Sequence, residues 1–276
     1  MTPHSTATGL DLLLDGVDAR FATAGGQIEA LAGLDLAVGA GSFTAVIGPN
    51  GCGKSTLLRV IAGLKAPDSG RALVGGAEPV AGDGRVGLDF QQPRLVPWRS
   101  VIDNVALPME LAGVAPDLRR DRAESALAQV GLATAARLRP RELSGGMAQR
   151  AALARALVGD PPVLLLDEPF SALDALTREE FDGELQRLWL ERPRTVVFVT
   201  HSVAEAVAIA DRVVVLTPRP GRVERLVEVD LARPRPVVVT ADPRAAAVAA
   251  EVRDALASVH ALELRPWSET PEAGAA

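Results

Sequence analysis

One nine-residue stretch constrains this chain more than any other: residues 48–56, with the sequence GPNGCGKST. It has the form G-x-x-x-x-G-K-[ST], in which the backbone N–H groups of a glycine-rich loop surround phosphate oxygens. The apolar run 43–47 precedes it and predicts a buried strand, while residues 57–62 predict a helix that ends at Gly63. Because the motif requires a strand, a loop and a helix in this order, the sequence predicts a phosphate-binding site.

Two side chains complete the chemistry of this loop. We expect Lys54 to reach the β- and γ-phosphates of a nucleotide as a compact point charge, and the Ser55 hydroxyl to ligate Mg²⁺. The single cysteine, Cys52, also lies in the loop, beside backbone amides and a helix N-terminus. These neighbours favour the thiolate, so we predict a reactive thiol that bound MgATP protects; the alternative is an inert thiol folded under the loop.

The composition limits the classes of protein that fit. With 276 residues and 48% apolar side chains, the chain can bury the core of one large domain or two small ones. A net charge of −6 argues against a nucleic-acid partner, since such domains are usually basic. A single cysteine excludes an intramolecular disulfide and favours a reducing compartment. The first eight residues do not have the pattern of a signal peptide, and no apolar run is long enough to span a bilayer, so any membrane role requires a partner.

Strands and helices alternate along most of the chain. The expected strands are 10–17, two short strands on either side of Gly33 within 28–38, and 71–74, 86–90, 163–166, 195–200 and 213–216. The expected helices are 57–62, three between 100 and 158 (the third over 148–158), 173–189 and 203–210. Phe21 is expected in a loop. Capping boxes are expected at Ser100 with Asp103 and at Ser202 with Glu205. This alternation predicts an α/β fold with a mainly parallel sheet. Residues 236–276 are expected to form a C-terminal extension with one helix and a disordered tail.

A second motif follows the apolar run 163–166, which ends in Asp167 and Glu168. A buried strand that ends in an acid, downstream of a phosphate loop, is the Walker B pattern. We expect Asp167 to hold Mg²⁺ and Glu168 to polarise the attacking water. The alternative, two acids in a solvated loop, is disfavoured because such a strand ends at the ligand-binding edge of a parallel sheet.

A third motif identifies a family. Residues 143–147, LSGGM, followed by Gln149 and Arg150, lie between the first two motifs and resemble the signature motif of ATP-binding cassette (ABC) ATPases. Gln91 resembles the glutamine of the Q-loop of that family, His201 its switch histidine, and Phe21 its adenine-stacking aromatic residue. Two positions depart from the usual pattern: Met147 replaces a glutamine, and Phe21 stands where a tyrosine is common. The resemblance covers about residues 10 to 230.

The resemblance implies a P-loop NTPase (RecA-like) core with an antiparallel β subdomain and an inserted α-helical subdomain at about 97–158, all within residues 10–235. The implied ATP-binding residues are Phe21, Gly48, Pro49, Asn50, Gly51, Cys52, Gly53, Lys54, Ser55 and Thr56. The implied catalytic residues are Glu168, His201 and Gln91, and the implied Mg²⁺ ligands are Ser55, Gln91 and Asp167. A second copy of the chain would supply its signature residues Leu143, Ser144, Gly145, Gly146 and Met147. Ser171, Ala172, Leu173 and Asp174 resemble the D-loop.

The resemblance also implies partners. The chain is expected to be the ATP-hydrolysing subunit of an ABC importer, a homodimer at the cytoplasmic face of the membrane, with a separate permease and a solute-binding protein. The run 95–98, LVPW, is interpreted either as a docking surface for the permease or as part of the core of the helical subdomain. Together with residues 100–105, 174–178 and 219–222, it is similar to ATPase subunits of nitrate, sulfonate and taurine importers.

Two other classes compete with this interpretation. A soluble, non-transport ABC ATPase of DNA repair or translation usually carries two cassettes, a long coiled coil or a zinc insertion. This chain has one cassette, one cysteine and no heptad run. An unrelated P-loop kinase or GTPase is disfavoured by the signature motif that lies between the two Walker motifs.

Overall fold

The computed structural model describes residues 9–23, 26–170, 175–235 and 242–263. Its centre is a six-stranded sheet. In spatial order the strands are β5 (Val86–Asp89), β6 (Val163–Asp167), β7 (Thr195–Val199), β3 (Phe43–Ile47), β8 (Arg212–Leu216) and β9 (Val223–Glu228). All neighbours pair in parallel except β8 with β9. Every residue of β3, β6 and β7 is buried, which explains why these strands are continuous apolar runs. The predicted α/β fold with a mainly parallel sheet is confirmed.

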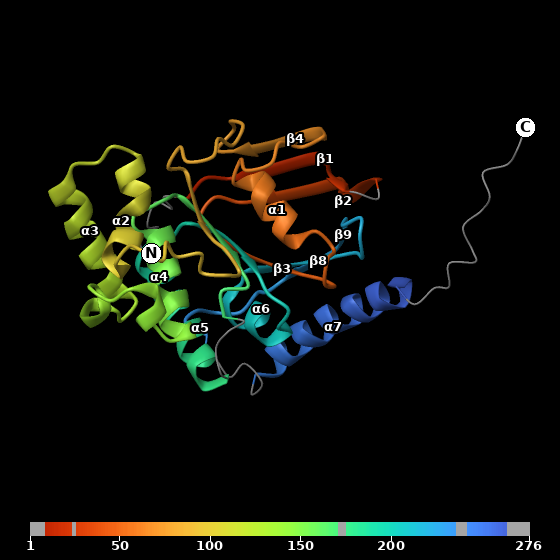
Figure 1. The fold of residues 1–276 in the computed structure, drawn as a ribbon. Helices are drawn as coiled ribbons and strands as arrows, with labels where there is room; N and C mark the ends of the chain where they lie inside the picture. Colours follow the sequence, from red (N-terminus) through yellow and green to blue (C-terminus); the bar gives the residue numbers. More distant parts are fainter. Residues whose placement is uncertain (1–8, 24–25, 171–174, 236–241, 264–276) are drawn as a thin grey trace, which may run out of the picture.

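A second, antiparallel sheet covers one face of the first (Figure 1). It consists of β1 (Leu12–Thr23), β2 (Gly26–Val38) and β4 (Ser69–Val74). The helix that follows the phosphate loop, α1 (Lys54–Ile61), lies between the two sheets (Figure 1). Its apolar side chains share one buried cluster with both sheets. The phosphate loop is therefore held from two sides.

Two predictions about this sheet are wrong. Phe21 lies in β1, where it pairs with Ile28, and not in a loop. Residues 28–38 belong to one continuous strand instead of two. The strand accommodates Gly33, whose φ is +54°, because the register of β1 and β2 shifts there and the Asp18 carboxylate accepts a hydrogen bond from the Gly33 N–H at 2.6 Å.

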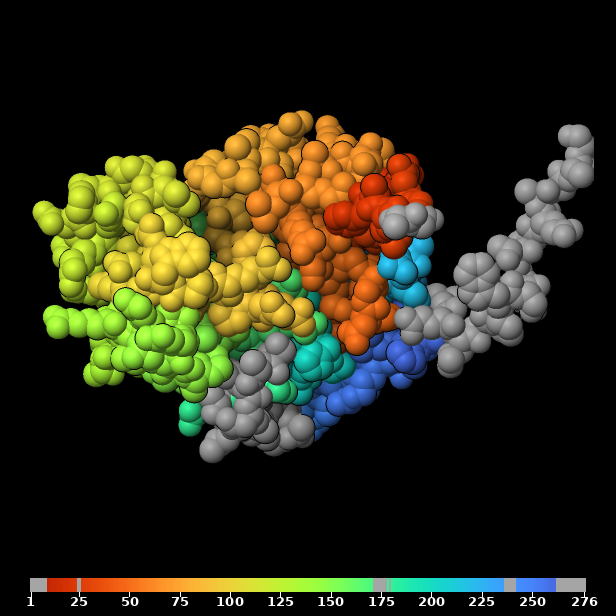
Figure 2. Space-filling model, in the orientation of Figure 1, coloured from red at the N-terminus to blue at the C-terminus, as the bar shows by residue number. Residues whose placement is uncertain are grey.

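The inserted helices form one end of the molecule, yellow and green in Figures 1 and 2. They are α2 (Val101–Leu111), α3 (Pro116–Gln129) and α4 (Gly145–Leu157). Ser100 caps α2 by accepting the Asp103 N–H at 3.3 Å, but the predicted capping box is only half formed, because the Asp103 carboxylate accepts from the Ser100 hydroxyl instead of the Ser100 N–H. The third helix begins at Gly145 and not at Ala148, because the Ser144 hydroxyl accepts the Met147 N–H at 3.2 Å and so forms the N-cap.

Three helices cover the other face of the central sheet: α5 (Ala175–Glu191), α6 (Val203–Ile209) and α7 (Pro243–Glu263). The α7 side chains of Val252 and Val259 are buried in the same apolar cluster as those of α6 and β8. The expected disordered tail, 268–276, lies outside the described residues. Within the described residues, no helix is both long and apolar enough to cross a membrane.

The capping box predicted at α6 is only half formed. Ser202 accepts the Glu205 N–H at 3.3 Å. The Glu205 carboxylate, however, accepts from the Thr200 hydroxyl, while the Ser202 N–H donates to Thr200 Oγ1 at 3.0 Å. The start of α6 is thus tied to the end of β7, beside His201.

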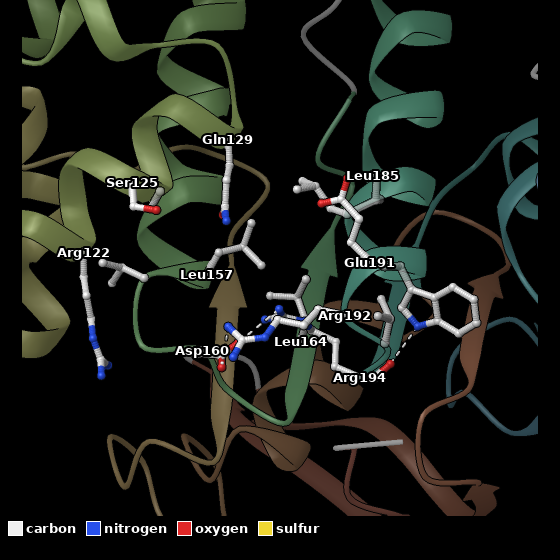
Figure 3. A pocket seen from close by; sticks show the side chains of 15 residues that line it. Arg122, Ser125, Gln129, Leu157, Asp160, Leu164, Leu185, Glu191, Arg192 and Arg194 are labelled. Atoms are coloured by element: carbon white, nitrogen blue, oxygen red, sulfur yellow. Dashed lines mark hydrogen bonds and ion pairs between the residues drawn. The ribbon is translucent and has the colours of Figure 1, made fainter. Parts of the chain in front are cut away.

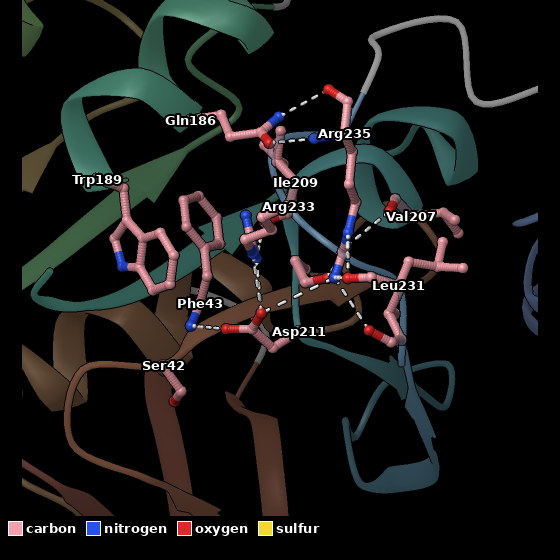
Figure 4. A network of polar contacts seen from close by, with 12 residues as sticks. Ser42, Phe43, Gln186, Trp189, Val207, Ile209, Asp211, Leu231, Arg233 and Arg235 are labelled. Carbon is pink, nitrogen blue, oxygen red and sulfur yellow. Dashed lines mark hydrogen bonds and ion pairs between the residues drawn. The ribbon is translucent and has the colours of Figure 1, made fainter. Parts of the chain in front are cut away.

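A buried arginine fixes the chain after β9 (Figure 4). The Arg235 side chain is 4% exposed and donates hydrogen bonds to four backbone carbonyls, of Val207, Ala210, Val229 and Leu231. Burial lowers its pKa to about 10, so it stays charged at neutral pH. The Gln186 side chain of α5 also hydrogen-bonds the Arg235 backbone. One guanidinium thereby joins α6 to the strand that precedes α7.

We predict that Arg235→Met lowers the free energy of unfolding by about 3 kcal/mol or more, because it leaves several buried carbonyls without a donor. Arg187→Met is the matched control, since Arg187 is 54% exposed and only pairs with Glu191 on the same helix. The control should change stability by less than about 0.5 kcal/mol. Urea denaturation of both variants measures the difference. Equal midpoints for Arg235→Met and the unaltered protein would contradict this role.

Candidate nucleotide site

The phosphate loop connects the carboxyl end of β3 to α1. Gly53, with a φ of +111°, precedes the helix, and Lys54 is its first residue. The Lys54 ammonium donates to the carbonyls of Gly48 and Pro49 at 2.8 and 2.9 Å, and the residue is only 6% exposed. Its partners are neutral carbonyl groups, so its positive charge remains available to an anion in the loop.

The loop can approach β2 closely because Gly53 has no side chain. A Cβ atom there would lie 2.6 Å from the Ala30 carbonyl oxygen and 2.7 Å from Leu31 Cδ2. Both distances are too short for any other residue, and the positive φ also favours glycine. The second glycine of the motif is therefore required by packing against the antiparallel sheet.

The Cys52 thiol does not face the site. Cys52 is fully buried, in the apolar cluster between the two sheets. The prediction of a reactive, nucleotide-protected thiol is therefore wrong, and the alternative of a thiol folded under the loop is correct. The local amides suggested reactivity, but depth decides whether a reagent reaches the sulfur.

A cavity of about 430 Å³ opens over the loop. Its lining residues are Phe21, Ile28, Ala30, Asn50, Gly51, Gly53, Lys54, Ser55, Thr56, Gln91, Glu168 and Arg219. The structure thus brings together Phe21, most of the loop, Gln91 and Glu168, which lie far apart in sequence. Gly48, Pro49 and Cys52 do not line it. The size suits a small-molecule site.

Sequence reasoning missed Ile28, Ala30 and Arg219 in this lining. Ile28 and Ala30 belong to β2 and face the cavity because Phe21 pairs with Ile28 in the neighbouring strand. No local pattern marks such apolar positions as functional. Arg219 had a signal, because it belongs to the run 219–222 that resembles importer ATPases.

Asp167 lies beneath the loop at the end of β6. It is 7% exposed, and burial raises its pKa, while a hydrogen bond from Ser55 opposes the shift and the charge of Glu168 adds to it. Ser55, Asp167 and Gln91 supply a hydroxyl, a carboxylate and an amide, the oxygen donors that Mg²⁺ prefers. Among the described residues no cluster of three His, Cys, Asp or Glu side chains could hold a metal.

Three polar side chains meet at one carboxylate: Gln91 and Glu168 line the cavity, and His201, which does not line it, lies beside Glu168. Gln91 Nε2 donates to Glu168 Oε2 at 3.0 Å, and His201 Nδ1 lies 3.9 Å from the same oxygen. The His201 side chain is 56% exposed, whereas that of Glu168 is 16% exposed. Glu168 has a φ of +48°, and its N–H is bonded to the Val199 carbonyl at 3.0 Å. Such backbone strain in a non-glycine residue is common at functional sites.

The signature residues lie at the N-terminus of α4. Ser144 is the N-cap, and Gly145, Gly146 and Met147 form the first turn. None of them lines the cavity over the phosphate loop of the same chain. A role at that cavity would require a second copy. The expected D-loop, 171–174, lies outside the described residues.

A buried polar link, also missed, connects α4 to the strand before Gln91. Gln149 Nε2 donates to Asp89 Oδ2 at 3.3 Å, and both residues are almost fully buried. Burial raises the pKa of Asp89 to about 7. Arg155, also on α4, donates to the carbonyls of Pro93 and Arg94 at 2.7 and 2.9 Å. The signature helix and the segment after Gln91 are thus bonded together.

Trp98 decides between the two interpretations of the run 95–98. Trp98 is 75% exposed, so it is not part of the core formed by the inserted helices α2, α3 and α4. Leu95, in contrast, packs against the main core cluster. Arg99 forms two hydrogen bonds with the Glu110 carboxylate, at 2.8 and 3.0 Å, which fixes the segment that presents Trp98.

A separate cavity of about 300 Å³ lies between α3, the end of α4 and α5 (Figure 3). Its polar side includes Arg192 and Arg194, which pair with Asp160 at 2.8 and 3.2 Å. It shares no lining residue with the cavity over the phosphate loop. None of the residues singled out by sequence motifs lines it.

Comparisons with known proteins agree with this geometry. The ABC transporter family model matches residues 31–171. The chain is 52% identical to aliphatic sulfonates import ATP-binding protein SsuB 1 of Mesorhizobium japonicum, over 80% of each chain. It is 45% identical to SsuB 2 of Pseudomonas aeruginosa, over 98% of this chain and 93% of the relative. The solved ATP-binding cassette MJ0796, a dimer in a post-hydrolysis state bound to ADP and Pi, aligns with a TM-score of 0.72 and 32% identity, over 80% of this chain and all of that one.

The buried thiol gives a direct test of the loop geometry. We predict that a maleimide modifies Cys52 in the native protein at least about 100-fold more slowly than in urea, because the sulfur is reached only when the structure opens. Intact-mass measurement over time gives both rates. Rapid labelling of the native protein, at the rate of a surface thiol, would contradict the buried position.

Proposed function

Because the chain belongs to the ABC transporter family and is the ATP-hydrolysing subunit of an importer, we propose that it powers uptake of aliphatic sulfonates through a separate permease. The observation that carries the choice of solute is the similarity to two aliphatic sulfonates import ATP-binding proteins, at 52% and 45% identity. A soluble, non-transport ATPase is not favoured, since these relatives are import proteins.

We propose the following roles for the cavity residues. The loop amides and Lys54 bind the triphosphate, and Phe21, the one aromatic side chain among the described residues of the lining, stacks on the base. Ser55, Asp167 and Gln91 would hold Mg²⁺, which supplies charge neutralisation at the phosphates when bound. Glu168 positions the attacking water. His201 and Gln91 both face one oxygen of the Glu168 carboxylate and orient that carboxylate.

The site is proposed to be completed by a second copy of the chain. Ser144, Gly145 and Gly146 form the N-terminus of α4, where free N–H groups and the helix dipole favour an anion. They do not line the cavity of their own chain. The dimeric state of the MJ0796 cassette supports a homodimer in which each copy offers this turn to the nucleotide of the other.

The remaining partners are also proposals. Trp98 is proposed to lie on the surface that docks the permease, which would place the chain at the cytoplasmic face of the membrane. A solute-binding protein would complete the importer. Residues 10–235 are proposed as the ATPase domain, with the helical subdomain at about 97–158 and an extension after residue 235.

We predict that Glu168→Gln keeps ATP affinity but lowers kcat at least about 100-fold, because the carboxylate acts only in the transition state. It should also accumulate a nucleotide-bound dimer. Lys54→Ala should instead lose ATP binding, since the ammonium contacts phosphate in the ground state as well. Phosphate release, ATP binding and size-exclusion chromatography with MgATP measure these effects.

Near-normal turnover in Glu168→Gln would remove Glu168 from this role. The solute is tested in cells whose own copy is deleted and whose only sulfur source is an alkanesulfonate. The unaltered chain should restore growth and Glu168→Gln should not. Growth without any copy of the chain would count against sulfonate uptake while leaving the ATPase assignment intact.

We predict that Trp98→Ala leaves the ATPase rate of the isolated subunit unchanged but reduces its recovery with membranes that contain the permease. The reason is the loss of a large exposed aromatic side chain, the type that dominates binding interfaces. Val80→Ala is the matched control, because Val80 is 60% exposed and lies outside the helical group. Equal recovery of both variants and the unaltered chain would contradict docking through Trp98.

A further inference from the structure

The turn between β8 and β9, residues 217–222 (TPRPGR), is wedged against the phosphate loop. The Gly221 N–H donates to the Ala30 carbonyl at 2.9 Å, and the Ala32 N–H donates to the Gly221 carbonyl at 3.2 Å. A Cβ atom on Gly221 would lie 2.2 Å from the Cys52 carbonyl oxygen. Only glycine allows this approach, so the turn is held in contact with both β2 and the loop.

Hydrogen bonds within the turn keep its shape. The Thr217 N–H donates to the Arg222 carbonyl at 3.0 Å, and the Arg222 N–H donates to Thr217 Oγ1 at 3.0 Å. The turn is therefore closed on itself and anchored at Gly221. Arg219 lies near its tip, and a side chain on such a preorganised support loses little freedom when it binds a ligand.

Arg219 lines the nucleotide cavity without a partner of its own. Among the described residues it forms no ion pair or hydrogen bond. Other arginines at or beside the strands, such as Arg85 before β5 and Arg212 in β8, are paired with carboxylates. Arg219 is thus a cation directed to a cavity whose proposed ligand is a nucleotide.

Lining residues other than Arg219 already serve the phosphate part of the cavity, which leaves the base and ribose for Arg219. The phosphate part already has Lys54 and the loop amides. Phe21 and Ile28, which pair across β1 and β2, form the apolar part of the lining. The Phe21 ring already has a cation over it, because Lys65 Nζ lies 5.2 Å from the ring centre. A guanidinium can stack on the π face of a base and can hydrogen-bond its ribose, which an ammonium does less well.

We propose that Arg219 is a further nucleotide-binding residue, and that it contacts the base and ribose of ATP. The sequence motifs assign no nucleotide-binding role to it, although it belongs to the run 219–222 that resembles importer ATPases. The proposal rests on the proposed function, because it requires ATP to occupy this cavity. It assigns a role to the turn 217–222: the turn carries one binding residue and at the same time braces the loop through Gly221.

The test compares two ligands that share only the phosphates. Calorimetry measures the dissociation constants of ATP and of inorganic tripolyphosphate, both with Mg²⁺, for the full chain. Arg219→Ala should weaken ATP binding about 10-fold, the effect of a lost cation–π contact, and leave tripolyphosphate binding unchanged. Arg219→Lys should fall between the two. Steady-state kinetics should show a higher KM for ATP with kcat unchanged.

Arg222→Ala is the matched control, since Arg222 lies in the same turn but does not line the cavity. It should bind both ligands like the unaltered chain. Unchanged ATP affinity in Arg219→Ala would overturn the inference, and so would an equal loss of ATP and tripolyphosphate, because that pattern means a phosphate contact or a distorted loop. If the unaltered chain bound tripolyphosphate but not ATP, the proposed function would fail together with it.

Discussion

The buried ammonium of Lys54 is the feature on which the rest of this structure depends. It lies at the junction of the central sheet and α1, 6% exposed, and it donates hydrogen bonds to the carbonyls of Gly48 and Pro49. Burying a charge is costly, and a bound phosphate would add a counter-charge to that of Asp167, which already interacts with Lys54. The loop can enclose the ammonium only because distant segments support it: β2 beneath Gly53 and the β8–β9 turn beneath Cys52.

The same arrangement explains how ATP binding or hydrolysis could move the inserted helices α2, α3 and α4. Glu168 at the end of β6 accepts a hydrogen bond from Gln91, and the strand before Gln91 is joined to α4 by Asp89 and Gln149. Arg155 adds two bonds from α4 to the backbone after Gln91. A shift of Gln91 on binding or hydrolysis would therefore act on the signature helix and on the segment that presents Trp98. Coupling of this kind needs a contiguous bonded path, which these contacts provide.

Local sequence was sufficient for some of these features and not for others. The phosphate loop, the acids after β6 and the cap at Ser100 depend on neighbours in sequence, so their patterns predicted them correctly. Phe21 was wrongly expected in a loop because the nearby glycines outweighed its pairing with Ile28 across the hairpin of β1 and β2. The burial of Cys52 could not be predicted, and the run 219–222 marked Arg219 without showing that it lines the cavity. Each depends on how β2 and the β8–β9 turn pack against the loop, and no local pattern encodes that contact.

The central claim is that a nucleotide lies on this loop and that a second copy completes the site. A crystal structure of the chain with Mg²⁺ and a non-hydrolysable ATP analogue tests it most directly. The account predicts the triphosphate against the loop amides with Lys54 Nζ on a phosphate oxygen, the base beside Phe21, and the partner's Ser144 at the γ-phosphate. A nucleotide bound elsewhere, such as in the cavity between α3 and α5, would contradict it. So would a nucleotide-bound chain in which no second copy approaches the γ-phosphate.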